Sequence, residues 1–253
     1  MEDNERQLRI AAVGDLHFDG SKHGSLRELF ADVHRNADIL AVCGDLTTHG
    51  APEQMRAFVD ELAGAEVPIV AVLGNHDFES GAEQELNDIL CAAGVHVLDG
   101  THIVIDGIGF AGTKGFAGGF GRGALGPFGE QLMKDFVNAA LEEALKIEKA
   151  LHQLDTDTKV VLLHYAPIEE TIRGEPEPVY PFLGSSRLLQ PLDTHGASVV
   201  FHGHAHHGSL EGHTPGGIPV FNVSLPLLAE AGMSYRTFSV PAPERRREAA
   251  PTE

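Results

Sequence analysis

Aspartate, asparagine and histidine side chains recur directly after short apolar runs in this sequence. The first three runs end in a glycine followed by a polar residue, in the pairs Gly14-Asp15, Gly44-Asp45 and Gly74-Asn75. The polar residues collected at the ends of all the runs are Asp15, His17, Asp45, Asn75, His76, His164, His202 and His204. In a parallel α/β sheet, residues just past the strand ends converge on one crevice. The sequence therefore predicts a single site that combines carboxylate, amide and imidazole donors.

This set of donors is larger than one metal ion needs. A catalytic metal ion uses about three or four protein ligands and keeps one position open for water. Two ions that share a bridging carboxylate suit eight donors better, and they leave His76 free for a second task. Burying the charge of Asp45 at the end of an apolar strand is costly without a cation, and a pair of ions removes that cost.

The elements that must position these residues have the pattern of a parallel α/β fold. Residues 8–13, 39–43 and 67–73 are too short for helices and rich in Val and Ile, which is typical of strands buried on both faces. Helical spacing of apolar residues lies between them, at 26, 29, 30 and 33 and at 55, 58, 59 and 62. Pro52 near the start of the second pattern and Gly64 after its end are typical helix boundaries.

The pattern changes after a third helix near residues 86–90. Closely spaced strands at 96–98, 102–105 and 109–111 predict antiparallel pairing. Residues 112–129 contain eight glycines and predict a flexible or tightly turning loop, followed by a long helix at 130–154. Further strands are expected at 159–163, 198–201, 219–223 and 235–240, and residues 241–253 are expected to form a solvated tail.

The composition of the chain argues against several classes of binding partner and of site. The chain has 253 residues and a formal charge of −19, which disfavours long nucleic acid and anionic membranes as partners. Two cysteines exclude a disulfide framework and a zinc site built from cysteines. The start lacks the apolar stretch of a signal peptide, and no apolar run approaches the ~20 residues of a membrane span. We expect a soluble cytoplasmic protein.

The ordered motifs resemble the signature of the calcineurin-like metallophosphoesterase superfamily. That signature reads D-x-H, GD, GNH[D/E], a single H, and GH-x-H. Its counterparts here, in the same order, are Asp15-Leu16-His17, Gly44-Asp45, Gly74-Asn75-His76-Asp77, His164 and Gly203-His204-Ala205-His206. The glycine register makes His204 and His206 the final pair. His202 then becomes a strand-end histidine or a residue that supports the ligands.

The resemblance implies both a fold and a ligand set. The fold is a single α/β domain over residues 1–240, with two facing mixed β-sheets flanked by helices in four layers. One metal ion is held by Asp15, His17, Asp45 and His206, and the other by Asp45, Asn75, His164 and His204. The implied cofactors are two divalent or mixed-valence transition-metal ions, manganese, iron or zinc. A hydroxide that bridges them attacks the phosphate in line, and His76 donates a proton to the leaving oxygen.

Several other residues are candidates for supporting roles. If the glycine-rich loop is a lid over the site, Lys114 and Arg122 are candidates for phosphate contacts. If the loop only connects two elements, these two residues have no such role. Asp77 either orients His76 or caps the next helix, and His49 lies close enough in sequence to support the site.

The function expected from the resemblance is metal-dependent hydrolysis of a small phosphodiester. Two alternatives remain: a phosphomonoesterase, or a non-catalytic scaffold that kept the fold for protein binding. Scaffolds of this kind typically lose metal or catalytic positions, whereas His76 and all the assigned ligands are present here.

Overall fold

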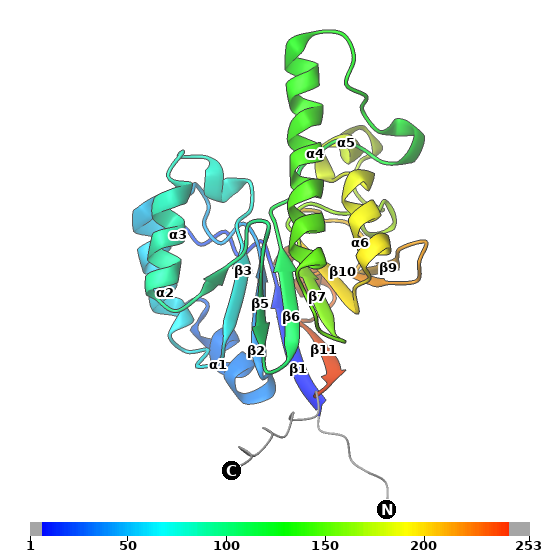
Figure 1. The fold of residues 1–253 in the computed structure, drawn as a ribbon. Helices are drawn as coiled ribbons and strands as arrows, with labels where there is room; N and C mark the ends of the chain where they lie inside the picture. The colour runs from blue at the N-terminus through cyan, green and yellow to red at the C-terminus, as the bar shows by residue number, and fades with distance from the viewer. Residues whose placement is uncertain (1–6, 243–253) are drawn as a thin grey trace, which may run out of the picture.

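The computed structural model describes residues 7–242, which form two β-sheets between layers of helices (Figure 1). Within these residues the first sheet has the strand order β11-β1-β2-β3-β4, with bounds β1 (Gln7–Val13), β2 (Ile39–Cys43), β3 (Ile69–Val72), β4 (His96–Val97) and β11 (Arg236–Pro241). The second has the order β5-β6-β7-β8-β10-β9, with bounds β5 (Thr101–Ile105), β6 (Ile108–Gly112), β7 (Lys159–Leu162), β8 (Val199–His202), β9 (Glu211–His213) and β10 (Pro219–Asn222).

The helices cover the outer sides of this pair of sheets. They are α1 (Arg27–Asn36), α2 (Pro52–Leu62), α3 (Glu83–Ala92), α4 (Gln131–His152), α5 (Tyr180–Leu183), α6 (Leu189–His195) and α7 (Leu225–Glu230). Helices α1 to α3 lie on one side and α4 and α6 on the other, so the layers run helix, sheet, sheet, helix (Figure 1). The expected fold of two facing mixed sheets flanked by helices is confirmed.

The core explains why the strand sequences are apolar on both faces. All five residues of β2 are buried, as the unbroken apolar run predicts. Along β7 the side chains alternate: Val160 and Leu162 join the core between the sheets, whereas Val161 packs in the core that includes α4 residues. β1, β2 and β3 are mutually parallel, and so are β7 and β8. Their carboxyl ends carry the predicted polar residues.

One predicted strand pairing is wrong. β5 and β6 are antiparallel neighbours, as expected, but β4 pairs in parallel with β3 in the first sheet. The reason is α3, which carries the chain back along the sheet before β4, and such a crossover returns the next strand in parallel. β5 belongs to the second sheet, although only three residues, 98–100, separate it from β4 in the sequence. The short strand β9 and helices α5 to α7 were not predicted.

The carboxyl-terminal boundary differs slightly from the sequence prediction. β11 extends to Pro241, which is paired with Gln7, and residues 243–253 of the expected tail lie outside the described residues. No helix within residues 7–242 combines the length and the apolar character needed to span a bilayer.

Candidate metal centre

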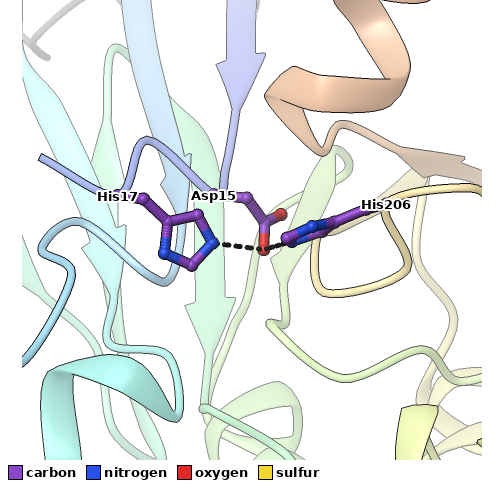
Figure 2. Close-up of side chains that lie close together, drawn as sticks. All are labelled: Asp15, His17 and His206. Atoms are coloured by element: carbon purple, nitrogen blue, oxygen red, sulfur yellow. Dashed lines mark hydrogen bonds and ion pairs between the residues drawn. The ribbon is translucent and has the colours of Figure 1, made fainter.

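The first cluster at the strand ends joins residues from the segment after β1 and from the segment after β8. Figure 2 shows the Asp15 carboxylate between the rings of His17 and His206. The distance from Asp15 Oδ1 to His206 Nε2 is 3.1 Å, and that to His17 Nε2 is 4.0 Å. One potential ligand atom from each of the three residues lies within 4.8 Å of the other two. This group combines one carboxylate and two imidazoles in the way a transition-metal site requires.

A second cluster lies beside the first and is centred on Asp45. Ligand atoms of Asp45, His164 and His204 lie within 4.8 Å of one another. Nε2 of His164 is 3.4 Å from Asp45 Oδ1 and 2.8 Å from the Asn75 side-chain oxygen.

Asp45 also faces the first cluster. Its Oδ2 lies 3.8 Å from His17 Nε2, so one carboxylate reaches toward ligands of both groups. The seven residues predicted as metal ligands are thus brought together around Asp15 and Asp45.

The backbone at these positions is held in a conformation that most residues avoid. Asp15, His17, Asp45 and His204 have φ angles of 55°, 43°, 51° and 70°, in the left-handed region. Such backbone costs of the order of 1–3 kcal/mol per residue and concentrates at functional sites, where surrounding contacts enforce it. At Gly74 a Cβ atom would collide with Asp45 Oδ1, which explains the glycine of this motif.

Hydrogen bonds decide which nitrogen of each histidine is free. Nδ1 of His164 lies 3.0 Å from the carbonyl oxygen of Cys43, and Nε2 of His204 lies 3.2 Å from that of Phe182. A carbonyl only accepts, so these two nitrogens are donors. When the ring is neutral, the opposite nitrogen, Nε2 of His164 and Nδ1 of His204, therefore carries the lone pair that a metal ligand needs.

The pKa shifts of three residues in these clusters, Asp15, His17 and His204, suit cations. Burial would raise the pKa of Asp15, but the hydrogen bond from His206 and the nearby histidines lower it to about 2. Burial lowers the pKa of His17 to about 4 and that of His204 to about 3. These imidazoles are therefore neutral near pH 7. Nε2 of His17 is buried with no hydrogen-bond partner within residues 7–242, although it faces two carboxylates.

His76 lies at the edge of this centre and is tied to it by its backbone. Its N–H donates to Asp45 Oδ1 over 2.9 Å, and its ring meets that of His17 edge-on at 4.7 Å between centroids. Nδ1 lies 2.8 Å from the carbonyl oxygen of Thr48, to which it donates, so Nε2 is the nitrogen left for other partners.

Asp77 has a role other than the predicted ones. Its buried carboxylate accepts from the backbone N–H groups of Leu46, Thr47 and Gly74 at 2.9–3.2 Å and from the Thr47 hydroxyl at 2.8 Å. No hydrogen bond to the His76 ring is present among the described residues. Asp77 therefore does not orient His76 or cap a helix; it joins the loop after β2 to the loop after β3. Burial, together with the charge of Asp45, raises its pKa.

Two histidines considered for supporting roles lie apart from the clusters. His202 is buried, and its ring nitrogens lie 2.7 Å from the Thr171 hydroxyl and 2.8 Å from the Gly203 carbonyl oxygen. It belongs to none of the groups of metal-ligand atoms found in residues 7–242. His49 is mostly exposed and faces Glu79, with 3.3 Å between Nδ1 and Oε2.

The two cations of the glycine-rich loop differ in position. The backbone oxygen of Lys114 accepts the N–H groups of His164 and Tyr165, which places Lys114 beside the centre. Its ammonium lies about 5 Å from the ring centroids of Phe78, Phe116 and Tyr165. Arg122 is exposed in a short 3₁₀ segment, Gly121–Gly123, and forms no ion pair within the described part of the chain.

Sequence reasoning missed Thr48 and Phe182, whose carbonyl groups orient His76 and His204. Any residue supplies a carbonyl, so no residue type could have signalled these contacts.

A family model described as calcineurin-like phosphoesterase matches residues 8–208. Similar solved structures include a phosphopantetheinyl hydrolase from Mycobacterium tuberculosis, with 15% identity, a TM-score of 0.64 and coverage of 95% of this chain and 98% of that one. A second is TT1561 of Thermus thermophilus, with 18% identity, a TM-score of 0.54 and coverage of 94% and 100%. A third is a purple acid phosphatase from yellow lupin, with 12% identity, a TM-score of 0.55 and coverage of 96% and 47%. A search of proteins with curated functions found no match.

Proposed function

The chain belongs to the calcineurin-like phosphoesterase family, and from that membership we propose a two-metal hydrolase whose substrate is a small phosphodiester. Hydrolysis of a phosphate ester is the activity that the family assigns. The observation that carries the proposal is the convergence of Asp15, Asp45 and their surrounding histidines at one end of the two sheets.

The residues of the centre fit a pair of transition-metal ions. Asp15, His17, Asp45 and His206 would hold one ion, and Asp45, Asn75, His164 and His204 the other. Imidazole, carboxylate and amide donors in this mixture suit manganese, iron or zinc. The unpartnered Nε2 of His17 and the buried carboxylates of Asp15 and Asp45 are the groups that most need a cation. When bound, the ions supply charge stabilisation at the phosphoryl oxygens and make a water molecule more acidic.

His76 is the residue proposed to act on the leaving group. Its Nδ1–H is held by the Thr48 carbonyl, so the ring is fixed with Nε2 available. Protonated at Nε2, it would donate to the departing oxygen while its backbone N–H holds Asp45 in place.

The charge around the centre favours a diester over a monoester. No lysine or arginine within residues 7–242 forms an ion pair with Asp15 or Asp45, and Lys114 is the cation placed beside them. A monoester phosphate brings nearly two negative charges at neutral pH, whereas a diester brings one. With few cationic side chains to supplement the two proposed ions, the site is better matched to the diester, and the net charge of −19 argues against long nucleic acid as the diester.

The test is a direct comparison of ester classes. Protein loaded with manganese, iron or zinc is assayed on a dialkyl or bis-nitrophenyl phosphate and on the matching monoester. We expect kcat/KM to favour the diester by about tenfold or more, a difference of ~1.4 kcal/mol in transition-state stabilisation. The variant Asp45→Asn should lose both activities, while Asp88→Asn, at an exposed carboxylate on α3, should keep them. Preference for the monoester would refute the diester assignment, and no hydrolysis with any metal would refute the function itself.

A further inference from the structure

A cavity of about 380 Å³ opens beside the candidate metal centre, between α3 and the carboxyl ends of β3 and β4. This volume lies at the small end of the range of ligand pockets, about 300–1,000 Å³. Its lining includes Leu73, Phe78, Glu83, Asn87, Val97 and Lys114.

Three of these lining residues connect the cavity to the centre. Leu73 directly precedes the Gly74-Asn75 motif, and Phe78 ends the 3₁₀ segment that begins at His76. The backbone oxygen of Lys114 accepts the N–H of His164 over 3.0 Å, and its ammonium lies 5.1 Å from the Phe78 ring centroid. A group attached to a phosphate at the centre therefore has this cavity next to it.

The walls of the cavity differ in chemistry. Leu73, Phe78 and Val97 provide apolar surface. Glu83 and Asn87 are four residues apart on α3 and so present a carboxylate and an amide from the same side of the helix. Oε2 of Glu83 is buried and has no hydrogen-bond partner anywhere in residues 7–242. A buried acceptor without a donor is costly, so this oxygen is suited to a ligand that brings a donor.

We propose that this cavity binds the alcohol portion of the phosphoester and selects small uncharged alcohols that carry a hydroxyl or amide N–H group for Glu83. The inference rests on the proposed function, because the phosphate of the same ester must lie at the metal centre. Alcohols that carry a carboxylate are disfavoured, since the two carboxylates of the lining, Glu83 and Asp99, outnumber its one cation, Lys114.

The experiment uses linear alkyl esters of phosphate, in whichever ester class the metal-loaded enzyme hydrolyses. One series ends in a hydroxyl group and the other in a carboxylate, with the alkyl chain lengthened in steps. The readout is the ratio of kcat/KM for hydroxyl-ended over carboxylate-ended esters of equal length. A ratio is independent of the fraction of active enzyme, so partial unfolding of a variant does not alter it. The variants are Glu83→Gln and the control Glu85→Gln, whose side chain faces Arg56 on the surface.

We expect the ratio for the unmodified enzyme to rise to about tenfold or more at the chain length that reaches Glu83, because hydrogen bonds to charged groups are the stronger ones. Glu83→Gln should abolish most of that preference, and Glu85→Gln should retain it. A ratio that is the same in the unmodified enzyme and in Glu83→Gln at every length would overturn the assignment of the cavity while leaving the proposed function intact. Absence of hydrolysis for all esters would overturn both.

Discussion

The Asp77 carboxylate offers a quantitative test of how the ligand-bearing loops are held. Asp77→Ala removes the acceptor of four donors: the N–H groups of Leu46, Thr47 and Gly74 and the Thr47 hydroxyl. A buried donor left without a partner costs about 1–3 kcal/mol, and water that enters the vacated space recovers part of this. We expect a loss of about 4 kcal/mol in the free energy of unfolding, a large part of the ~5–15 kcal/mol of a typical domain.

The isosteric variant Asp77→Asn removes the charge and one acceptor oxygen but fills the same space, so it leaves no cavity. Comparing it with Asp77→Ala therefore separates the two effects. Oδ1 accepts from the Thr47 N–H and hydroxyl, whereas Oδ2 accepts from the N–H groups of Leu46 and Gly74. An amide offers one oxygen, so two donors would face an NH₂ group, and we expect a loss of about 2–3 kcal/mol.

Urea unfolding in the presence of a chelator measures both losses without a contribution from metal binding. The matched control is Asp88→Asn on α3, where an exposed carboxylate accepts from Gln84 and the change should stay within about 0.5 kcal/mol. Losses below about 1 kcal/mol for both Asp77 variants would refute the role assigned to this carboxylate. If Asp77 instead oriented His76, Asp77→Asn would preserve stability and slow only the hydrolysis of esters with poor leaving groups.

Four further substitutions test the centre. His206→Ala should lose metal and activity, whereas His202→Ala should cost only about 10–100-fold in activity; equilibrium dialysis with rate measurements compares them, and the reverse order would reject the glycine register. His76→Ala should lose about 10²–10⁴-fold on alkyl esters but far less on nitrophenyl esters, with metal content unchanged; equal losses on the two would contradict proton donation. Gly74→Ala should weaken metal binding, because its Cβ collides with Asp45 Oδ1; unchanged affinity would contradict the close packing of Asp45 against that glycine.

The strands and most site positions were predictable because they depend on local pattern. Residues 39–43 form β2 with the predicted bounds, since a short apolar run buried on both faces leaves few other solutions. The polar residues after β1, β2 and β3 of the first sheet and after β7 of the second come together because the carboxyl ends of these strands meet at one end of the two facing sheets. The choice of His206 over His202 needed the glycine register, since strand position alone favours His202.

The remaining features depend on contacts between distant segments. β4 is two residues long, and its own sequence does not determine whether it joins β3 or β5. The partners of Asp77 lie up to 31 residues away, so its role as a link between loops has no sequence signal. The cavity beside the centre likewise exists only once α3 packs near Lys114.

The proposed role of Asp45 as a ligand shared by two metal ions is tested most directly by elemental analysis of the metal-loaded protein and its Asp45→Asn variant. The prediction is about two ions per chain in the unmodified protein and the loss of both together in the variant, because the shared carboxylate offsets the charge of both cations. Two ions retained at full occupancy in Asp45→Asn would contradict the two-metal centre built on this residue.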